Sequence, residues 1–334
     1  MPSQAPARPG SPPPARDDSD CAATGQLNSD LTAAVYHSAV EAGLSIALAR
    51  EVARHTPARA RRPGRLLVAC DLDRTLCYSA AALGLAGLDA RAPGLVVAEV
   101  YQGVPISFYT RDAESMLTVL AQSAELVPTT TRTREQYERL RLPVSPRYAI
   151  AANGGYLLED GVPDRAWSLR VAASLKSGCA PITEVVQHLE QISDPLWLRK
   201  RRVAEGLFAY LVVEREAMPS TLIPDLSRWC TPRGWSVSVQ GRKVYCVPQP
   251  LTKSAAVAEV ARRSAAMHTA AAGDSILDQD MLAAADKAIR PAHGELHDIA
   301  WETPQLSVTD SAGVLGGQEI CARLLAYALA VSNE

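Results

Sequence analysis

Two pairs of aspartates have the residue type and spacing of a metal-binding site. Asp71 and Asp73 directly follow the continuous apolar run 66–70, and Asp274 and Asp278 follow a second, Ala-rich run. If the four carboxylates meet, their like charges need a nearby cation to stay ionised. A ligand set made of oxygen atoms favours Mg²⁺ over zinc. The sequence therefore predicts a magnesium site that contains these four carboxylates.

A hydroxyl and an ammonium group stand where they could act on a phosphoryl group. Thr130 follows a second predicted strand, and Lys253 begins a predicted helix. Beside a carboxylate and metal site, such groups suit the oxygen atoms of a transferring phosphoryl group. The alternatives are structural: strand-end polarity for Thr130, a solvated helix position for Lys253, and turn or helix capping for the aspartates.

The elements that must position these residues alternate between strands and helices. Such alternation predicts an α/β fold with a Rossmann-like, doubly wound parallel sheet, interrupted by an α+β insertion. In such sheets the chemistry lies at the carboxyl ends of the strands, where each acidic motif falls. The expected core strands are 66–70, 125–129, 148–152, 269–272 and 287–290, with a hairpin at 97–109; the expected core helices are 111–123, 132–140, 253–263, 278–285 and 317–331.

The chain divides into five consecutive parts by composition and periodicity. The first is rich in Pro, Ser and charge, and it cannot bury enough apolar surface to offset its ordering entropy. The second contains a predicted helix at 30–56, which could dock a protein partner. The expected parts are a disordered tail at 1–29, an N-terminal helix and linker at 30–64, the first half of the core at 65–155, an α+β insertion at 156–247, and the second half of the core at 248–334.

The overall composition argues against several classes of protein. The 334 residues carry a formal net charge of -2, which does not suit a general nucleic-acid binder. The 7 cysteines are scattered and form no CxxC pair, which argues against a disulfide framework or zinc knuckle and favours a reducing cytoplasm. No apolar run approaches the ~18 residues that span a bilayer, so we expect no membrane segment.

These motifs, in this order, resemble the haloacid-dehalogenase-like phosphatase superfamily. Its first motif, DxDx[TV], is matched by residues 71–75, and its second, a Thr or Ser after the next strand, by Thr130. Its third, a Lys, is matched by Lys253, and its fourth, GDxxxD, by residues 273–278. The resemblance covers roughly residues 65–310 and implies a phosphatase.

The long insertion between the second and third motifs resembles the type IIB cap of this superfamily. The subtype that is similar contains sucrose-phosphate phosphatases, Cof-type sugar phosphatases and phosphomannomutases. Its hallmarks are matched by Val247-Pro248, by the run 278–282, and by Asn153-Gly154-Gly155, which resembles an Asn-Gly-Ala turn. More narrowly, the chain resembles proteins of this superfamily encoded with bacterial tellurite-resistance and stress genes.

Two departures from the subtype concern residues beside the expected site. Arg74 replaces a common glycine and places a bulky cation there. The run 129–132, Thr-Thr-Thr-Arg, replaces a frequent Ala-Thr-Gly-Arg, so Thr131 could compete with Thr130 for its role. By this resemblance Thr131, Arg132 and Asn153 are candidates for substrate binding, although a surface helix position is an equal alternative for the arginine.

The resemblance also implies a chemical role for each catalytic candidate. Asp71 attacks phosphorus and forms an aspartyl-phosphate. Asp73 gives a proton to the leaving oxygen and then takes one from water. Thr130 and Lys253 bind the phosphoryl oxygens.

A metal site built from the acidic motifs is implied in the same way. Mg²⁺ is held by Asp71, by the backbone carbonyl of Asp73 and by Asp274. Asp278 orients Lys253 or completes the outer shell of the metal.

Three classes of function remain open from the sequence. The first is hydrolysis of a small phosphorylated metabolite, with phosphosugars favoured. The second is a sugar phosphomutase, in which water is excluded and the phosphoryl group returns to the sugar. The third is a regulatory or binding protein of low turnover in a stress response.

Several other motifs have a structural and a functional interpretation. The basic run 199–202 could grip an anionic substrate, but a solvated charged face is favoured. His293 and His297 are four residues apart without the HExxH pattern, which favours a structural role. Cys70 and Cys77 flank the expected site, and burial as small apolar side chains is favoured for both.

Overall fold

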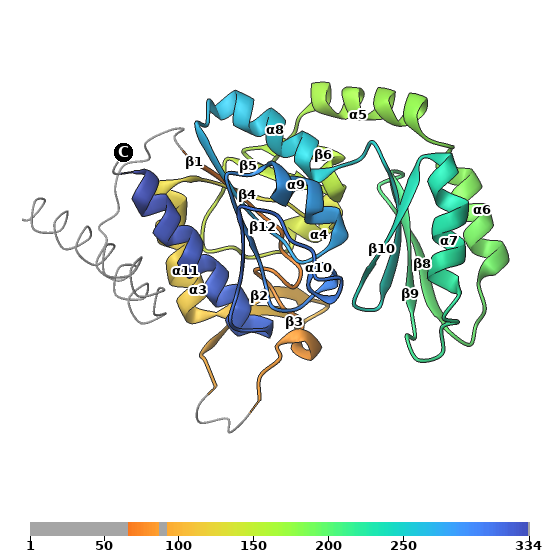
Figure 1. Ribbon diagram of the computed structural model, residues 1–334, viewed down its shortest axis with the longest axis horizontal. Coiled ribbons are helices and arrows are strands. Elements are labelled where there is room, and N and C mark those ends of the chain that lie inside the picture. The colour runs from red at the N-terminus through yellow and green to blue at the C-terminus, as the bar shows by residue number, and fades with distance from the viewer. Residues whose placement is uncertain (1–65, 87–91, 333–334) are drawn as a thin grey trace, which may run out of the picture.

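The computed structural model of the chain describes residues 66–86 and 92–332 (Figure 1). The expected tail at 1–29, and the expected helix at 30–56 with its linker, lie outside the described residues. The predicted partner surface on that helix lies outside them as well.

A five-stranded parallel sheet forms the centre of the fold, in the order β14-β13-β12-β1-β4. The central strand β1 is buried along its whole length, as its continuous apolar sequence predicts for a strand covered on both faces. The chain leaves β1 to form β4 on one side and later returns to form β12 on the other. The site-bearing loops therefore meet at a topological switch point. The strands are β1 Leu66–Cys70, β4 Glu125–Pro128, β12 His268–Ala272, β13 Lys287–Arg290 and β14 Leu306–Val308.

Helices cover both faces of this sheet and make the fold doubly wound, as expected (Figure 1). On one face, α3 (Arg111–Ser123) and α11 (Gly313–Val331) pack against the alternate residues Leu66, Val68 and Cys70 of β1. On the other face, Leu67 and Ala69 pack against α8 (Lys253–Ser264) and α9 (Gln279–Ala284). The period of two along β1 therefore divides the core into two apolar layers.

The last helix corrects one expectation. By length and composition, α11 with its 19 residues could cross a membrane, although the sequence was expected to contain no run approaching that length. Most of its apolar window, 67%, is buried inside the protein. Its apolar composition is accounted for by its place in the core, against the sheet and α3.

A hairpin of β2 (Leu95–Tyr101) and β3 (Val104–Thr110) follows β1, close to the predicted range 97–109. Its two turn residues, Gln102 and Gly103, both have positive φ, which suits the twist of a two-residue hairpin turn. The side chain of Thr110 then caps α3 by accepting a hydrogen bond from a backbone amide. This hairpin brings Glu99 to the edge of the site.

The third predicted core strand is placed differently from expectation. β5 (Tyr148–Ala151) touches the end of β4 through a single bridge between Thr129 and Ile150. It forms instead an antiparallel sheet with β6 (Tyr156–Glu159) and β7 (Val162–Pro163). Tyr156 follows at once after the turn at Asn153-Gly154-Gly155, so antiparallel pairing with β6 is the local solution.

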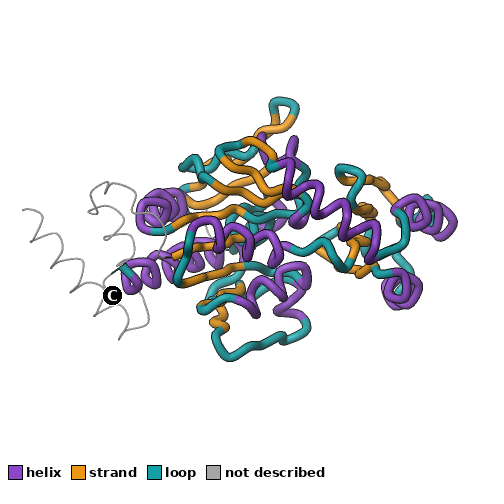
Figure 2. Tube along the Cα trace, turned by 90° about the horizontal axis from the view of Figure 1, so that it is seen from above, coloured by secondary structure: helices purple, strands orange, loops and turns teal. Residues whose placement is uncertain are grey.

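The cap is an antiparallel sheet covered on one face by two helices. Its strand order is β10-β11-β9-β8, with α6 and α7 packed on the apolar face (Figure 2). The strands are β8 Leu198–Ala204, β9 Phe208–Val213, β10 Trp235–Gln240 and β11 Lys243–Pro248; the two covering helices are α6 Ile182–Ile192 and α7 Leu222–Cys230, and α5 Arg165–Gly178 precedes them.

Some elements are shorter than expected or absent from the prediction. The helix expected at 132–140 is reduced to α4 because Thr133 forms a capping box with Gln136 that fixes its start. Neither α5, α7, β8 nor β14 was predicted, and β8 coincides with the basic run. The remaining short elements are α4 Arg134–Glu138, α10 Glu295–Asp298, η1 Ala80–Ala82, η3 Ala152–Gly154, η4 Thr231–Arg233 and η5 Ile276–Asp278.

Candidate active site

A buried ion pair between Asp71 and Lys253 lies at the centre of the site. Asp71 directly follows β1, and Lys253 is the first residue of α8. The Lys253 Nζ donates to Asp71 Oδ1 at 2.5 Å and to Asp278 Oδ1 at 2.6 Å. Thr75 Oγ1 donates to the other oxygen of Asp71, Oδ2, at 3.1 Å. Lys253 is 0% exposed, so the solvated helix position considered for it is wrong.

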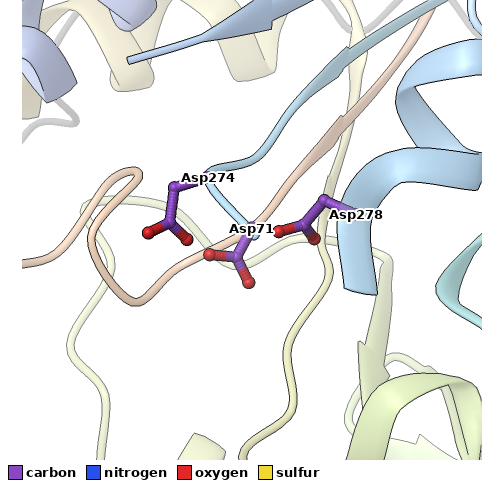
Figure 3. A group of neighbouring side chains, drawn as sticks. All are labelled: Asp71, Asp274 and Asp278. Atoms are coloured by element: carbon purple, nitrogen blue, oxygen red, sulfur yellow. The ribbon is translucent and has the colours of Figure 1, made fainter. Parts of the chain in front are cut away.

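Three of the predicted carboxylates form one buried group. One oxygen from each of Asp71, Asp274 and Asp278 lies within 4.8 Å of the others, and Figure 3 shows the side chains converging. Burial raises the pKa of Asp71 to about 7, with Asp278 adding to this effect and Lys253 opposing it. Burial, with the charges of the other two, also raises the pKa of Asp274 well above its usual range. When all three carboxylates are ionised, they carry more negative charge than the single ammonium of Lys253 balances, and the raised pKa values reflect this.

Two glycines keep space beside these carboxylates. A Cβ atom on Gly273 would come within 2.4 Å of the Cβ of Asp278. A Cβ atom on Gly294 would come within 2.6 Å of Asp274 Oδ2. The clustered, all-oxygen donor set fits Mg²⁺, which prefers carboxylate ligands and whose charge would offset their repulsion. The carboxylate of Asp73, also predicted as a ligand, is not part of this group.

Asp278 has two structural tasks within the group. One of its oxygens accepts from Lys253, and the other, Oδ2, accepts from Ser275 N at 3.0 Å and from Ser275 Oγ at 2.7 Å. The Ser275 contacts form a capping box that fixes the start of η5. Asp278 therefore contacts Lys253, as the expected orienting role requires, and it also lies in the first turn of a helix, as its structural alternative requires.

The carboxylate of Asp73 is instead held by Arg132. The guanidinium donates from Nε to Asp73 Oδ2 at 3.1 Å and from Nη2 to Asp73 Oδ1 at 2.8 Å. Its third nitrogen, Nη1, donates to Glu99 Oε2 at 2.5 Å. Partial loss of hydration acts to raise the pKa of Asp73, but the positive charge and hydrogen bonds of the guanidinium have the larger effect. The resulting pKa of Asp73 is lowered to about 2. Arg132 is 8% exposed, so the surface position considered for it is wrong.

The remaining predicted residues line the loop between β4 and β5. Thr130 is fully buried, and its Oγ1 accepts from Arg132 N at 3.1 Å, which leaves its own proton free to donate. Thr131 is the next residue, also buried. Asn153 Nδ2 donates to Leu251 O at 2.7 Å, whereas its Oδ1 is buried without a protein partner in the described part of the chain.

Arg74 adopts a left-handed conformation with φ of 67°, where glycine is favoured. Its Nε donates to Asp274 Oδ2 at 3.2 Å. Gly313 N donates to His293 Nδ1 at 3.1 Å, so the ring proton sits on Nε2 and is donated to Arg74 O at 2.8 Å. His297 contacts a different arginine. The structural role favoured for the two histidines is thus confirmed.

Solved structures of other proteins show which fold this is. The sucrose-phosphatase of Synechocystis, in complex with sucrose and phosphate, aligns with a TM-score of 0.52 and 16% identity over 75% of this chain and 94% of that chain. A protein of Thermoplasma acidophilum aligns with a TM-score of 0.52 and 12% identity over 79% and 99%. The chain has the haloacid dehalogenase-like fold. No family model matches it, and neither does any curated protein sequence.

The comparison confirms the fold that the motifs imply. In this haloacid dehalogenase-like fold, the parallel sheet with its helices is the core, and the segment that carries the four-stranded antiparallel sheet is the cap. The narrower resemblance to proteins encoded with tellurite-resistance and stress genes stays a prediction, because neither structure bears on it.

Two glutamates, the buried Glu99 and the partly buried Glu295, support the site but are missing from the sequence-based prediction. Glu99 holds Arg132 and also accepts from Arg139 Nε at 3.1 Å. Glu295 Oε2 accepts from Ser238 Oγ in the cap at 2.7 Å and from Ile276 N in the core at 3.1 Å. An acid within the apolar strand sequence LVVAEVY was a usable signal for Glu99. Glu295 had none, because its partners lie far away in the sequence.

Proposed function

We propose that this chain is a Mg²⁺-dependent phosphomonoester hydrolase that uses Asp71 as its nucleophile. The observation that carries the proposal is the environment of Asp71 at the switch point of the sheet. Lys253 and Thr75 fix its carboxylate from two sides. Asp274 and Asp278 lie within 4.8 Å of it. The carboxylate of Asp71 is thus held in one position, beside an ammonium and beside two carboxylates that need a cation. This arrangement suits nucleophilic attack on phosphorus.

The reaction proceeds in two displacements at phosphorus. An oxygen of Asp71 forms a bond to phosphorus while the bond from phosphorus to the leaving oxygen breaks, and Asp73 gives that oxygen a proton. A water molecule then attacks phosphorus, Asp73 takes its proton, and the bond to Asp71 breaks to release orthophosphate. Lys253 and Thr130 donate to the phosphoryl oxygens, where charge accumulates during both steps.

Arg132 must change partners for Asp73 to work as an acid. In the free protein the guanidinium keeps Asp73 ionised. A phosphoryl group entering the site offers new oxygen acceptors, and Arg132 turns to them while Glu99 still holds its Nη1. Release of Asp73 from its cation raises its pKa, so it can take up the proton that it later donates.

The metal that fits the acidic group is Mg²⁺, which Asp71 and Asp274 would hold with the backbone carbonyl of Asp73. When bound, it supplies positive charge that neutralises the carboxylates and the phosphoryl oxygens. Asp278 acts through Lys253, because both its oxygens are already engaged by the ammonium and by Ser275.

The substrate class is a small phosphorylated metabolite, with a phosphosugar favoured. The sucrose-phosphatase of Synechocystis was solved with sucrose and phosphate, and its fold is shared by this chain over most of its length. The cap over the site supports a substrate small enough to be enclosed.

Removal of the metal tests the proposal directly. We expect EDTA to abolish orthophosphate release from p-nitrophenyl phosphate and sugar monophosphates, and Mg²⁺ to restore it, by a factor of about 10³ or more, because the carboxylates need a compensating cation. Phosphate release is followed as a function of Mg²⁺ concentration. Turnover that is insensitive to EDTA would contradict the metal, and a protein inert across the panel would favour a regulatory role. Release of phosphate without any added bisphosphate distinguishes a hydrolase from a mutase.

Arg74 makes a separate prediction about metal affinity. The guanidinium already occupies Asp274 Oδ2, so we expect Arg74→Gly to bind Mg²⁺ about tenfold more tightly in calorimetric titration. The substitution also relieves the left-handed backbone, which costs a non-glycine residue about 1–2 kcal/mol. Gln102→Gly is the matched control because it relieves a positive φ of 50° in an exposed hairpin turn. Unchanged or weaker binding in Arg74→Gly would show that this arginine does not compete with the metal.

A further inference from the structure

The cap sheet has two chemically different faces. On one face, Leu211, Val213 and Val244 are fully buried and belong to the core that the cap strands form with α6 and α7. The opposite face carries the alternate residues of the same strands. We call it the cleft face, because it is turned toward the core, which Ser238 contacts through Glu295. The residues on it are Ser238, Tyr245, Tyr210, Lys243, Lys200 and Arg202.

One row of residues runs across this second face from strand to strand. The register places Ser238 beside Tyr245, Tyr245 beside Tyr210, and Tyr210 beside Arg202. Ser238 Oγ donates to Glu295 in the core at 2.7 Å. In an antiparallel sheet, directly paired residues lie on the same face. The row therefore points toward the core domain and its carboxylates.

The next row on the same face contains two lysines. The register places Lys243 of β11 beside Val212, and Val212 beside Lys200 of β8. The Nζ of Lys243 lies 5.7 Å from the ring centre of Tyr210 and 5.9 Å from that of Tyr245. The charge of Asp73 in the core acts on both Lys243 and Tyr245. The Tyr245 side chain also hydrogen-bonds to Thr131 of the core, so Lys243 lies on the face of the cap that is turned toward the core site.

The basic run 199–202 is divided between the two faces. Arg201 pairs with Glu190 of α6 at 2.6 Å, and Arg199 lies 3.6 Å from Glu214. Lys200 and Arg202 alternate with them. Within the described residues, no carboxylate forms an ion pair with Lys200, Arg202 or Lys243. Lys200 and Arg202 thus lack the carboxylate partners that Arg199 and Arg201 have, and Lys243 is hydrogen-bonded to the Tyr245 side chain rather than paired with a carboxylate.

Cations in this position exceed what a phosphoryl group requires. The core already provides Lys253, Arg132 and the acidic metal group for the three phosphoryl oxygens. A surface that carries several positive charges attracts and holds anions. The aromatic rings beside Lys243 offer a flat apolar surface and a weak cation–π contact. A hydrogen-bonded ion pair between Lys243 and an anion would be stronger than this contact.

We propose that the substrate carries a second anionic group, a carboxylate or a second phosphate, on its leaving portion, and that Lys243 binds this group with Arg202 and Lys200. The body of the substrate packs against Tyr210 and Tyr245. This inference rests on the proposed function, because it identifies the leaving portion of the same reaction. It also assigns the half of the basic run that faces the cleft.

Binding to the Asp71→Asn variant in the presence of Mg²⁺ tests the inference without turnover. The probes are two matched pairs: 6-phosphogluconate with glucose 6-phosphate, and fructose 1,6-bisphosphate with fructose 6-phosphate. Each pair differs chiefly by one anionic group. In isothermal titration calorimetry, we expect the more anionic member of at least one pair to bind about tenfold more tightly than the other member, or better. A charge-assisted hydrogen bond contributes a free energy of this size.

Two double substitutions on one strand provide the matched comparison. In the Asp71→Asn background, Lys200→Gln with Arg202→Gln, and separately Lys243→Gln, should reduce that preference to about threefold or less. Arg199→Gln with Arg201→Gln removes the same charge from the same strand and should retain the preference. Circular dichroism verifies that each variant is folded.

Equal binding within both pairs, or a preference that survives the cleft-face substitutions, would overturn the inference. Turnover of p-nitrophenyl phosphate by the unmodified protein separates the two proposals. If turnover depends on Mg²⁺ but the paired ligands bind equally, the proposal of a second anionic group is contradicted and the proposal of a hydrolase is supported. Preferential binding that depends on Lys243, without any turnover, supports the anion site and overturns hydrolysis.

Discussion

Asp71→Asn is expected to lower kcat at least about 10⁴-fold while the protein stays folded, because removal of the nucleophile leaves little of covalent catalysis. Asn keeps the shape of the side chain and can still accept from Lys253 or Thr75 through its one oxygen. The measurement is steady-state release of orthophosphate at saturating Mg²⁺ from the best substrate of the panel.

The same substitution should raise the stability of the metal-free protein. Asp71 is a buried carboxylate whose neighbours include two others within 4.8 Å, and burial raises its pKa to about 7. Removing one of three like charges lowers their repulsion, whereas Lys253 keeps Asp278 as a partner. We expect a higher melting temperature in EDTA, with about 2–4 °C for each kcal/mol in a domain of 150–250 residues. The stabilisation by added Mg²⁺ should shrink in parallel.

Asp280→Asn is the control for Asp71→Asn. Asp280 is exposed and follows the fourth motif closely, so its loss removes one nearby charge without touching the acidic group. It should leave both turnover and the response to Mg²⁺ unchanged. Asp71→Ala excludes residual activity that arises from deamidation of the asparagine, which mass spectrometry also detects. Near-normal turnover in Asp71→Ala would contradict the nucleophile assignment.

The placement of the acidic motifs followed from the sequence for a physical reason. A continuous apolar run such as Leu66–Cys70 can be satisfied only by burial on both faces, which a parallel sheet provides. Carboxylates that follow such runs then meet at one edge of the sheet. The proximity of Asp71 and Asp274 could therefore be predicted from the few residues that precede each of them. The same reasoning predicted Lys253 at the start of its helix, and the structure adds that Thr252 is the cap of this helix.

The partners of Arg132 and the position of β5 could not be predicted in this way. Glu99 reaches Arg132 across 33 positions of sequence, through a hairpin whose packing no local pattern specifies. Tyr148–Ala151 is as apolar as a core strand, but its neighbour β6 follows after a tight turn and takes it as an antiparallel partner. The two faces of β8 were also hidden, because four consecutive basic residues show no alternation in composition.

Lys253→Met should have the second-largest effect, since it damages both catalysis and stability. The ammonium is 0% exposed and donates to Asp71 and to Asp278, so its loss leaves two buried carboxylates without a counter-charge. We expect the free energy of unfolding to fall by about 3–5 kcal/mol in EDTA. We expect kcat to fall by about 10²–10³, the usual cost of a lost donor to developing charge. Chemical denaturation and phosphate release measure the two effects.

A second substitution separates the two effects of Lys253. In Lys253→Met with Asp278→Asn, one of the stranded carboxylates is neutral, and its remaining oxygen can still accept from Ser275. The double variant should recover much of the lost stability, because the two side chains form one interacting unit, yet it should remain inactive. Lys176→Met in α5 removes an exposed lysine and should change neither quantity. If the double variant stays as unstable as the single one, the buried charge of Asp278 is not the source of the instability; if it regains turnover, Lys253 is not a ligand of the phosphoryl group.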